Sequence, residues 1–228
     1  MLWDAIQRRA DAFWLAILIL LFPFSWPAYF LVVKSRDYGW GRLLRTGQRS
    51  NTLALDELEA KAIVTGTSES KLDLADALED SERALEAEAV YRGVLAEHPT
   101  NLRALHGLAR SLLSLQRPGE AVEALEKVLE ADRAYRGYAA ALDYAEALWQ
   151  NDQRDDALEL LAAMAATTGR MNHRVAHAHY LTAAGKTQSA REVLTAALEA
   201  YETYQFVDKR REQYWAIRAE QMLEELAA

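Results

Sequence analysis

The sequence predicts an all-α fold in which an N-terminal transmembrane helix precedes an α-solenoid of repeated helix pairs and a C-terminal capping helix. Residues 12–33 contain no charged side chain, which is the pattern of a membrane-spanning helix. Residues 74–99 and 108–132 share one skeleton of Leu and Ala positions, which indicates an internal repeat. Small residues continue that repeat at intervals of 34, 36 and 33 residues, at Ala87, Ala121, Ala157 and Ala190.

Charge divides the chain of 228 residues into two parts. Residues 1–50 hold seven Lys or Arg and three Asp, a net charge of +4, which leaves −12 for the remaining 178 residues because the whole chain carries −8. An acidic body argues against a nucleic-acid partner, since phosphate binding needs clustered Lys and Arg. The absence of cysteine excludes disulfides, thiolate metal sites and a cysteine nucleophile.

The uncharged run is long enough to span a bilayer once. As a helix its 22 residues rise about 33 Å, close to the hydrocarbon thickness of about 30 Å. A cleavable signal peptide is disfavoured, because bulky residues end the run and no small-x-small site precedes Lys34. Two arginines precede the run and five basic residues follow it, so the positive-inside rule places the C-terminal body in the cytoplasm. We therefore expect residues 1–34 to anchor the protein in a bacterial inner membrane as a single span.

Two prolines interrupt this expected helix. Pro23 and Pro27 leave backbone carbonyls without their usual donors, and lipid cannot replace those donors. The Ser25 hydroxyl, local tightening of the helix or a neighbouring transmembrane helix could do so. The sequence leaves open a kinked anchor, a helix that docks against a membrane-embedded partner, and a re-entrant hairpin. The hairpin is disfavoured, because each arm of about ten residues reaches only about 15 Å.

Residues 12–36 also resemble the second hydrophobic segment of the cardiolipin-synthase-type N-terminal membrane module. Pro23, Tyr29 and Lys34 stand for the mid-helix proline, the following tyrosine and the basic exit of that module. The first membrane segment of the module has no counterpart here. The resemblance therefore implies no lipid chemistry.

The body of the chain repeats a pattern of small and bulky residues. Small residues recur in the first half of each unit, at Ala75, Ala109, Ala145 and Ala178. Bulky residues follow the second set of alanines by four positions, at Tyr91, Leu125, Leu161 and Leu194. A small residue lets two helices approach closely, and a bulky one fills the space over the next turn. This pattern resembles the tetratricopeptide repeat (TPR), a 34-residue helix–turn–helix unit, and covers about four repeats over residues 68–204.

The repeats differ in how well they match. Pro99 ends the first repeat, and Gly185 makes the turn of the fourth. The third and fourth repeats are degenerate, because Gly169 stands where the closing proline belongs and residues 135–137 include two extra positions.

The flanking segments are expected to join and close this array. Residues 35–67 form a juxtamembrane linker with a short helix at 52–63, and a polar loop at 64–70 follows, in which Ser70 and Asp73 resemble a capping pair. Residues 205–228 form a capping helix, because the last repeat would otherwise expose a core face. The apolar face of that helix is predicted to contain Val207, Tyr214, Ile217, Met222 and Leu226.

The TPR resemblance implies a concave groove that receives a peptide or helix of a protein partner. The groove positions, transferred residue by residue, are Asp76, Glu79, Arg103, His106, Arg110, Glu146, Trp149 and His179. A merely solvated helix face is the alternative, and Trp149 could instead fill space beneath the terminal helix. The family's clamp for a terminal carboxylate is not matched, because the corresponding first positions are acidic or apolar.

Catalytic and metal-binding motifs are not evident. His173 and His177 have the one-turn spacing of metal ligands, but no carboxylate lies near them in the sequence, so packed or solvated histidines are favoured over a metal site. No phosphate loop, nucleophile elbow or dinucleotide fingerprint occurs, and we expect no enzyme activity and no cofactor.

These observations favour a membrane-anchored scaffold or assembly factor that binds a protein partner at the cytoplasmic face. The alternative is an accessory subunit of an integral membrane complex, held mainly through the kinked helix. The sequence leaves the partner and the oligomeric state open.

Overall fold

The computed structural model describes residues 47–227 and the side-chain surroundings from residue 54 onward. The expected membrane segment, with Pro23, Ser25 and Pro27, lies outside the described residues. The chain divides into two compact units, residues 1–56 and 57–228, and the repeats belong to the second. None of the helices within residues 47–227 combines the length and the apolarity needed to cross a bilayer.

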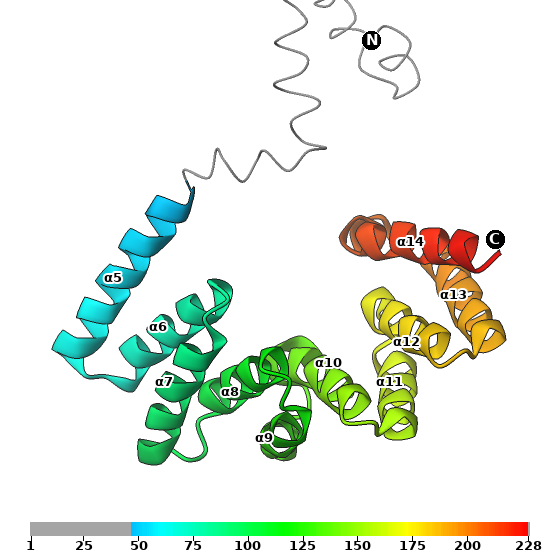
Figure 1. Ribbon diagram of the computed structural model, residues 1–228. Coiled ribbons are helices and arrows are strands. Elements are labelled where there is room, and N and C mark those ends of the chain that lie inside the picture. The colour runs from blue at the N-terminus through cyan, green and yellow to red at the C-terminus, as the bar shows by residue number, and fades with distance from the viewer. Residues whose placement is uncertain (1–46, 228) are drawn as a thin grey trace, which may run out of the picture. The chain divides into compact units, whose positions relative to one another are not determined.

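The described part of the chain consists of α-helices joined by short turns (Figure 1). No strand occurs within residues 47–227. The ten helices are α5 (Gly47–Thr65), α6 (Ser68–Asp80), α7 (Ala84–Glu97), α8 (Leu102–Ser114), α9 (Pro118–Ala131), α10 (Tyr135–Gln150), α11 (Arg154–Thr168), α12 (Met171–Ala183), α13 (Thr187–Glu202) and α14 (Phe206–Ala227).

Neighbouring helices from α6 to α13 form four consecutive pairs. In each pair the first helix packs against the second, and the second packs against the first helix of the next pair. First helices of neighbouring pairs also touch, as α6 does with α8. The second unit is therefore an α-solenoid of stacked helix pairs, as the internal repeat predicts.

The core of each pair is built from the predicted small and bulky residues. All twelve of these positions are fully buried: Ala75, Ala87, Tyr91, Ala109, Ala121, Leu125, Ala145, Ala157, Leu161, Ala178, Ala190 and Leu194. The first pair adds a close approach between α7 and α8, where a Cβ on Gly107 would overlap the ring of Tyr91. Only glycine fits at this position of α8.

The turn inside every pair uses the same backbone conformation. One residue in each turn has positive φ, namely Glu82, Gln116, Asp152 and Gly185, with φ values of 62°, 60°, 62° and 74°. The next residue donates a backbone hydrogen bond of 2.9 Å to a leucine near the end of the first helix, for example from Arg83 to Leu78. Such a bond satisfies a carbonyl that the helix end would leave free. The role predicted for Gly185 is confirmed.

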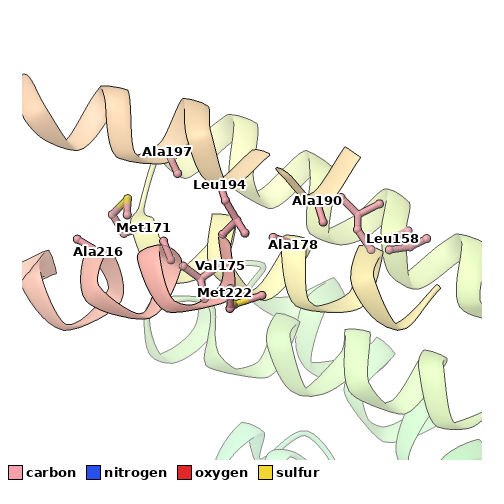
Figure 2. Packing of buried hydrophobic residues seen from close by; sticks show 11 residues of the cluster. Leu158, Met171, Val175, Ala178, Ala190, Leu194, Ala197, Ala216 and Met222 are labelled. Atoms are coloured by element: carbon pink, nitrogen blue, oxygen red, sulfur yellow. The ribbon is translucent and has the colours of Figure 1, made fainter. Parts of the chain in front are cut away.

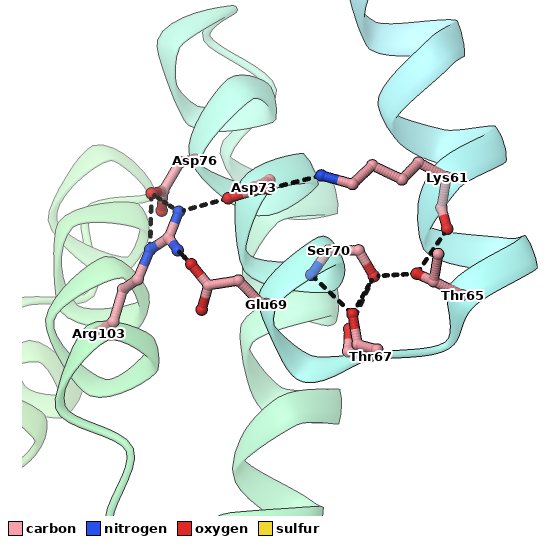
Figure 3. Close-up of polar contacts among 8 residues, drawn as sticks. All are labelled: Lys61, Thr65, Thr67, Glu69, Ser70, Asp73, Asp76 and Arg103. Atoms are coloured by element: carbon pink, nitrogen blue, oxygen red, sulfur yellow. Dashed lines mark hydrogen bonds and ion pairs between the residues drawn. The ribbon is translucent and has the colours of Figure 1, made fainter.

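The entry to the first pair differs from its prediction. α5 continues to Thr65 and α6 begins at Ser68, so the polar loop expected at residues 64–70 is wrong. Thr67 is the N-cap of α6, and its hydroxyl accepts a hydrogen bond of 3.3 Å from the backbone N–H of Ser70 (Figure 3). Ser70 therefore lies inside the helix, and the predicted capping pair of Ser70 and Asp73 is wrong.

The degenerate half of the array contains a local irregularity. Arg136, Gly137 and Tyr138 all have left-handed backbone angles at the start of α10, where the repeat has its extra residues. Arg170 donates a hydrogen bond of 3.3 Å to the carbonyl of Gly137 from the far end of the third pair. α11 ends at Gly169, whose φ of 63° is that of a left-handed C-cap in place of a closing proline.

The terminal helix closes the core, but with a different face from the predicted one. α14 packs against α12 and α13, and Ala216, Ala219 and Met222 join a cluster with Met171, Val175 and Leu194 (Figure 2). Met222 was assigned correctly, and Leu226 packs partly buried against the cluster. Val207, Tyr214 and Ile217 are 75%, 69% and 46% exposed, so their assignment to the buried face is wrong. Small alanines replace them at the interface.

Candidate protein-binding site

The first helices of the pairs, together with α14, present one side of the solenoid, which we call the first-helix face. At its N-terminal end Arg103 of α8 is surrounded by carboxylates of α6 (Figure 3). Its guanidinium donates to Asp76 at 2.7 Å and to Asp73 at 3.0 Å, and it also pairs with Glu69. Hydrogen bonds from Arg103 and Lys61 hold the pKa of Asp73 below its ordinary value. Arg103 therefore joins the first two repeats.

The neighbouring charges are paired in the same way. Arg110 Nε lies 2.9 Å from Glu79 Oε1, and the Tyr91 hydroxyl donates to Asp76 at 2.5 Å. Burial raises the pKa of the Glu79 carboxyl in spite of the attraction of Arg110. Burial and the Asp76 carboxylate likewise raise the pKa of Tyr91. These side chains connect helices of the solenoid to one another.

His106 continues this pairing into the third repeat. Its side chain is 3% exposed, and its Nε2 lies 2.6 Å from Asp143 Oδ2 on α10. The ring also meets Tyr135 edge-on, with 5.6 Å between centroids. The predicted groove residues at this end of the face thus make polar contacts within the solenoid: Asp76, Glu79, Arg103, His106 and Arg110. Their role in binding a partner stays a prediction.

The C-terminal end of the first-helix face is aromatic. Trp149 of α10 and Tyr180 of α12 meet edge-on with 5.1 Å between centroids, and His179 meets Tyr180 at 5.4 Å. The Tyr180 hydroxyl donates to Glu146, and the guanidinium of Arg154 lies 5.3 Å from the Trp149 ring. Glu146, Trp149 and His179 therefore all contact Tyr180, and their role in binding a partner stays a prediction.

A pocket of about 280 Å³ lies beside this aromatic group, between α10, α12 and α14. Its lining is mostly apolar and aromatic, with Asn172, His179 and Arg218 as the polar members. The remaining lining residues are Leu142, Val175, Ala176, Tyr180, Tyr214, Trp215 and Met222. Apolar walls with a few polar groups are typical of a site that takes one anchoring side chain.

Two polar groups at the pocket are suited to a peptide. Asn172 makes no side-chain hydrogen bond within the described residues, so its amide is available to a backbone N–H and C=O. Arg218 pairs with Glu225 at 3.2 Å and is 39% exposed, so its guanidinium can also reach a ligand.

Sequence reasoning missed the contribution of α14 to this pocket. The sequence placed Tyr214 on the apolar face of the capping helix, and it did not single out Trp215 or Arg218. The repeat pattern covers first helices only up to α12, so it gives no groove positions on α14. The adjacent Tyr214 and Trp215, which meet edge-on at 5.0 Å, were the available signal, because aromatic pairs are enriched at binding surfaces.

The histidine pair is placed inside the fold. His173 is fully buried, its Nδ1 lies 2.6 Å from the Thr168 hydroxyl, and its Nε2 has no partner within the described residues. Burial and the charge of Arg170 lower the pKa of His173, and burial lowers that of His177. Residues 47–227 contain no group of three His, Asp or Glu side chains that could hold a metal ion.

A larger hollow of about 950 Å³ lies between α9, α10 and α11. Tyr138 and Tyr144 line it together with Leu129, Leu160 and Met164. The Tyr144 hydroxyl donates to Glu126 at the rim at 3.0 Å, and burial with this carboxylate raises the pKa of Tyr144 to about 12. Tyr138, the last of the three left-handed residues, lines this hollow, which therefore accompanies the irregular junction.

Comparisons with known proteins agree with the fold. Residues 78–138 match the family model of the tetratricopeptide repeat. Among solved structures, MamA from Desulfovibrio magneticus RS-1 is 20% identical, with a TM-score of 0.58 over 72% of this chain and 91% of that one. TPR-like repeats of a protein described as a kinesin light chain, from Podosopora anserina, are 26% identical, with a TM-score of 0.53 over 70% and 90%. YrrB, "a TPR protein with an unusual peptide-binding site", is 16% identical, with a TM-score of 0.55 over 78% and 87%. A comparison with curated proteins gives no match.

The described chain is therefore a TPR-like α-solenoid, and residues 78–138 are the part that matches the tetratricopeptide-repeat model. Solenoids of this kind are scaffolds for protein–protein interaction.

Proposed function

We propose that this protein is a membrane-anchored, non-catalytic scaffold that binds an extended peptide or a helix of a protein partner on its first-helix face. The pocket between α10, α12 and α14 carries the proposal, because it combines apolar walls with polar groups suited to a peptide. An aromatic or branched aliphatic side chain of the partner fills the pocket. Asn172 holds the partner backbone, and Arg218 favours a carboxylate beside the anchor.

The charged end of the first-helix face is not the main binding site in this proposal. Its arginines already contact carboxylates of neighbouring helices, so a partner would have to replace those contacts to bind there. Exchange of one ion pair for another yields little net free energy. We therefore place the affinity at the aromatic end and assign the charged end to the stability of the repeats.

Selection from a random peptide display library on the detergent-solubilised full chain tests the pocket. We expect recovered peptides to share an aromatic or aliphatic anchor, and Asn172→Ala with His179→Ala to weaken them about tenfold or more. His98→Ala, an exposed histidine outside the pocket, is the matched control and leaves binding unchanged. Peptides that bind both variants equally would place the site elsewhere.

Membrane anchoring through residues 12–33 is the second part of the proposal. It rests on the length of the uncharged run and on the flanking basic residues, which favour a cytoplasmic solenoid at a bacterial inner membrane. A tethered solenoid meets a membrane-associated partner at a raised effective concentration. We expect the chain to stay with the membrane after alkaline extraction and a reporter fused after Ala228 to be active only in the cytoplasm.

Replacement of Pro23 and Pro27 by leucine separates this function from that of an accessory subunit. A scaffold that binds through its pocket keeps its partner in this variant and loses it in the Asn172 and His179 variant. The reverse pattern would identify a subunit held through the membrane helix.

A further inference from the structure

Helix α14 leaves one side uncovered along its length. We call this side the outer face of α14; its residues are Phe206, Val207, Arg210, Tyr214, Ile217, Gln221 and Glu224. Tyr214 lies at the edge of this face, where it also lines the pocket. Phe206 and Val207 are 79% and 75% exposed, and Tyr214 and Ile217 follow on the same side at helical spacing. A row of large, exposed apolar side chains marks an interaction surface more often than a helix face that contacts only water.

The position of α14 in the stack explains why this side is free. α14 packs against the preceding helices α12 and α13, as α8 packs against α6 and α7, so it takes the place of a fifth first helix. Each of the four preceding first helices is also covered by the second helix of its own pair. Within residues 47–227 no such helix covers the outer face of α14 (Figure 1).

The two halves of α14 differ in net charge. The first half has Lys209, Arg210 and Arg211 against Asp208 and Glu212, whereas the second half has Glu220, Glu224 and Glu225 against Arg218. Arg210, Glu220 and Glu224 are exposed and make no ion pair within the described residues. A helix that is basic at one end and acidic at the other is complementary to a copy of itself in the opposite direction.

We propose that the outer face of α14 binds the outer face of a second copy of this chain, with the two helices antiparallel about a two-fold axis. In the register that sets Tyr214 of one copy opposite Ile217 of the other, Arg210 lies opposite Gln221 and within one turn of Glu220 and Glu224 of the second copy. The apolar side chains meet at the centre, and both sets of opposite charges meet at the two ends. The second copy thus takes the position that the second helix of a pair holds in the preceding repeats.

Charge disfavours a parallel pair and an anionic lipid surface on this face. In a parallel pair Arg210 would face Arg210, and the glutamates would face one another. On an anionic lipid surface the basic half would be attracted, but the carboxylates of the second half would be repelled. Because one helix pair forms a small contact compared with obligate dimers, we expect the dimer to dissociate reversibly.

Charge reversal on the full chain tests the proposal. Arg210→Glu leaves only acidic charges on the outer face, and Glu224→Arg leaves only basic ones. We expect either variant alone to self-associate at least about tenfold more weakly than the wild type in analytical ultracentrifugation in detergent. An equimolar mixture of the two restores the dimer, which also shows that both variants are folded. Lys127→Glu with Arg133→Glu, exposed on and just after α9, is the matched control and dimerises as the wild type does.

Cysteine crosslinking fixes the direction of the helices, because the natural chain has no cysteine. We expect Ile217→Cys, near the two-fold axis, to form an intermolecular disulfide, and Arg210→Cys, far from the axis, to remain a thiol. A wild-type monomer at all concentrations, no dimer in the mixture, or preferential crosslinking through Arg210→Cys would overturn the proposal. Binding of the all-basic variant alone to anionic vesicles would not restore it, since the wild-type face carries both charges.

Discussion

The two halves of the solenoid are built from the same repeat. They differ in how many side chains of the first-helix face are already bonded to other residues of the solenoid. In the first two repeats, charged residues of the first-helix face bond to one another, and Arg103 alone contacts three carboxylates. In the last two repeats the backbone turns left-handed at residues 136–138, and the same face carries aromatic rings around a pocket. The match to the TPR family model ends at residue 138, where this change begins.

This difference indicates a division of roles between the halves. Regular repeats with complementary charges give a firm stack and leave few polar groups for a partner. Departure from the pattern accompanies the hollow between α9, α10 and α11, and the side-chain amide of Asn172 makes no hydrogen bond within the described residues. The half of the array that Gly169 and residues 135–137 make hard to recognise is therefore the half that contains the proposed binding pocket.

The largest expected effect concerns the regular half. Gly107→Ala should lower the free energy of unfolding by about 1 to 3 kcal/mol, because the added methyl group overlaps the fully buried ring of Tyr91. That ring cannot withdraw without breaking its hydrogen bond to Asp76. Urea unfolding of the full chain followed by circular dichroism measures the change.

Gly93→Ala is the matched control for this substitution. Gly93 lies in α7, and a Cβ there meets nothing within 4 Å. Alanine at this position should stabilise the helix by about 0.5 to 1 kcal/mol, since glycine is the poorer helix former. Equal effects at both positions would show that the contact between α7 and α8 is not tight.

Most of the fold, but only part of the candidate site, could be predicted from the sequence. The spacing of alanines predicted the core residues of all four pairs, because a 34-residue period fixes which side chains meet. The turns at Glu82, Gln116 and Asp152 were not predicted, since Glu and Gln are not typical of left-handed backbone and a single Asp is a weak signal for it. The pairing of Arg103 with α6, and the face that α14 buries, depend on contacts between helices that a pattern within one helix does not reveal.

The second expected effect is pH dependence of the irregular half. Burial and Arg170 lower the pKa of His173, so in acid the unfolded chain takes up the proton before the folded one does. The contribution of His173 to the free energy of unfolding is therefore fully present above the ordinary histidine pKa of about 6.5. At lower pH this free energy decreases by up to about 1.4 kcal/mol per pH unit. His173→Gln should flatten the unfolding free energy between pH 7 and 5; parallel curves for variant and wild type would refute this assignment.

The third effect concerns the left-handed junction. Gly137→Ala should destabilise the protein by about 1 kcal/mol, because its φ of 67° is strained for a residue with a Cβ. Thermal unfolding detects the change. An unchanged melting temperature would mean that the junction adopts other backbone angles in solution.

The smallest effect concerns the ion pairs of the regular half. Arg103→Leu should cost about 1 kcal/mol at low salt and less at high salt, because exposed pairs are screened. The folded-state pKa of Asp73 is lowered, so the stabilisation is present above the ordinary Asp pKa of about 3.9 and is lost as the pH falls. Unfolding curves at two salt concentrations measure it. A loss that is independent of salt would indicate that Arg103 acts through packing instead.

Hydrogen exchange of the full chain, with and without a peptide recovered from the display library, tests the division of roles most directly. Binding at the aromatic pocket predicts slower exchange in α12 (Met171–Ala183) and α14 (Phe206–Ala227) and unchanged exchange in α6 and α8. Protection confined to α6 and α8 would contradict this account, because it would place the partner on the charged end of the first-helix face.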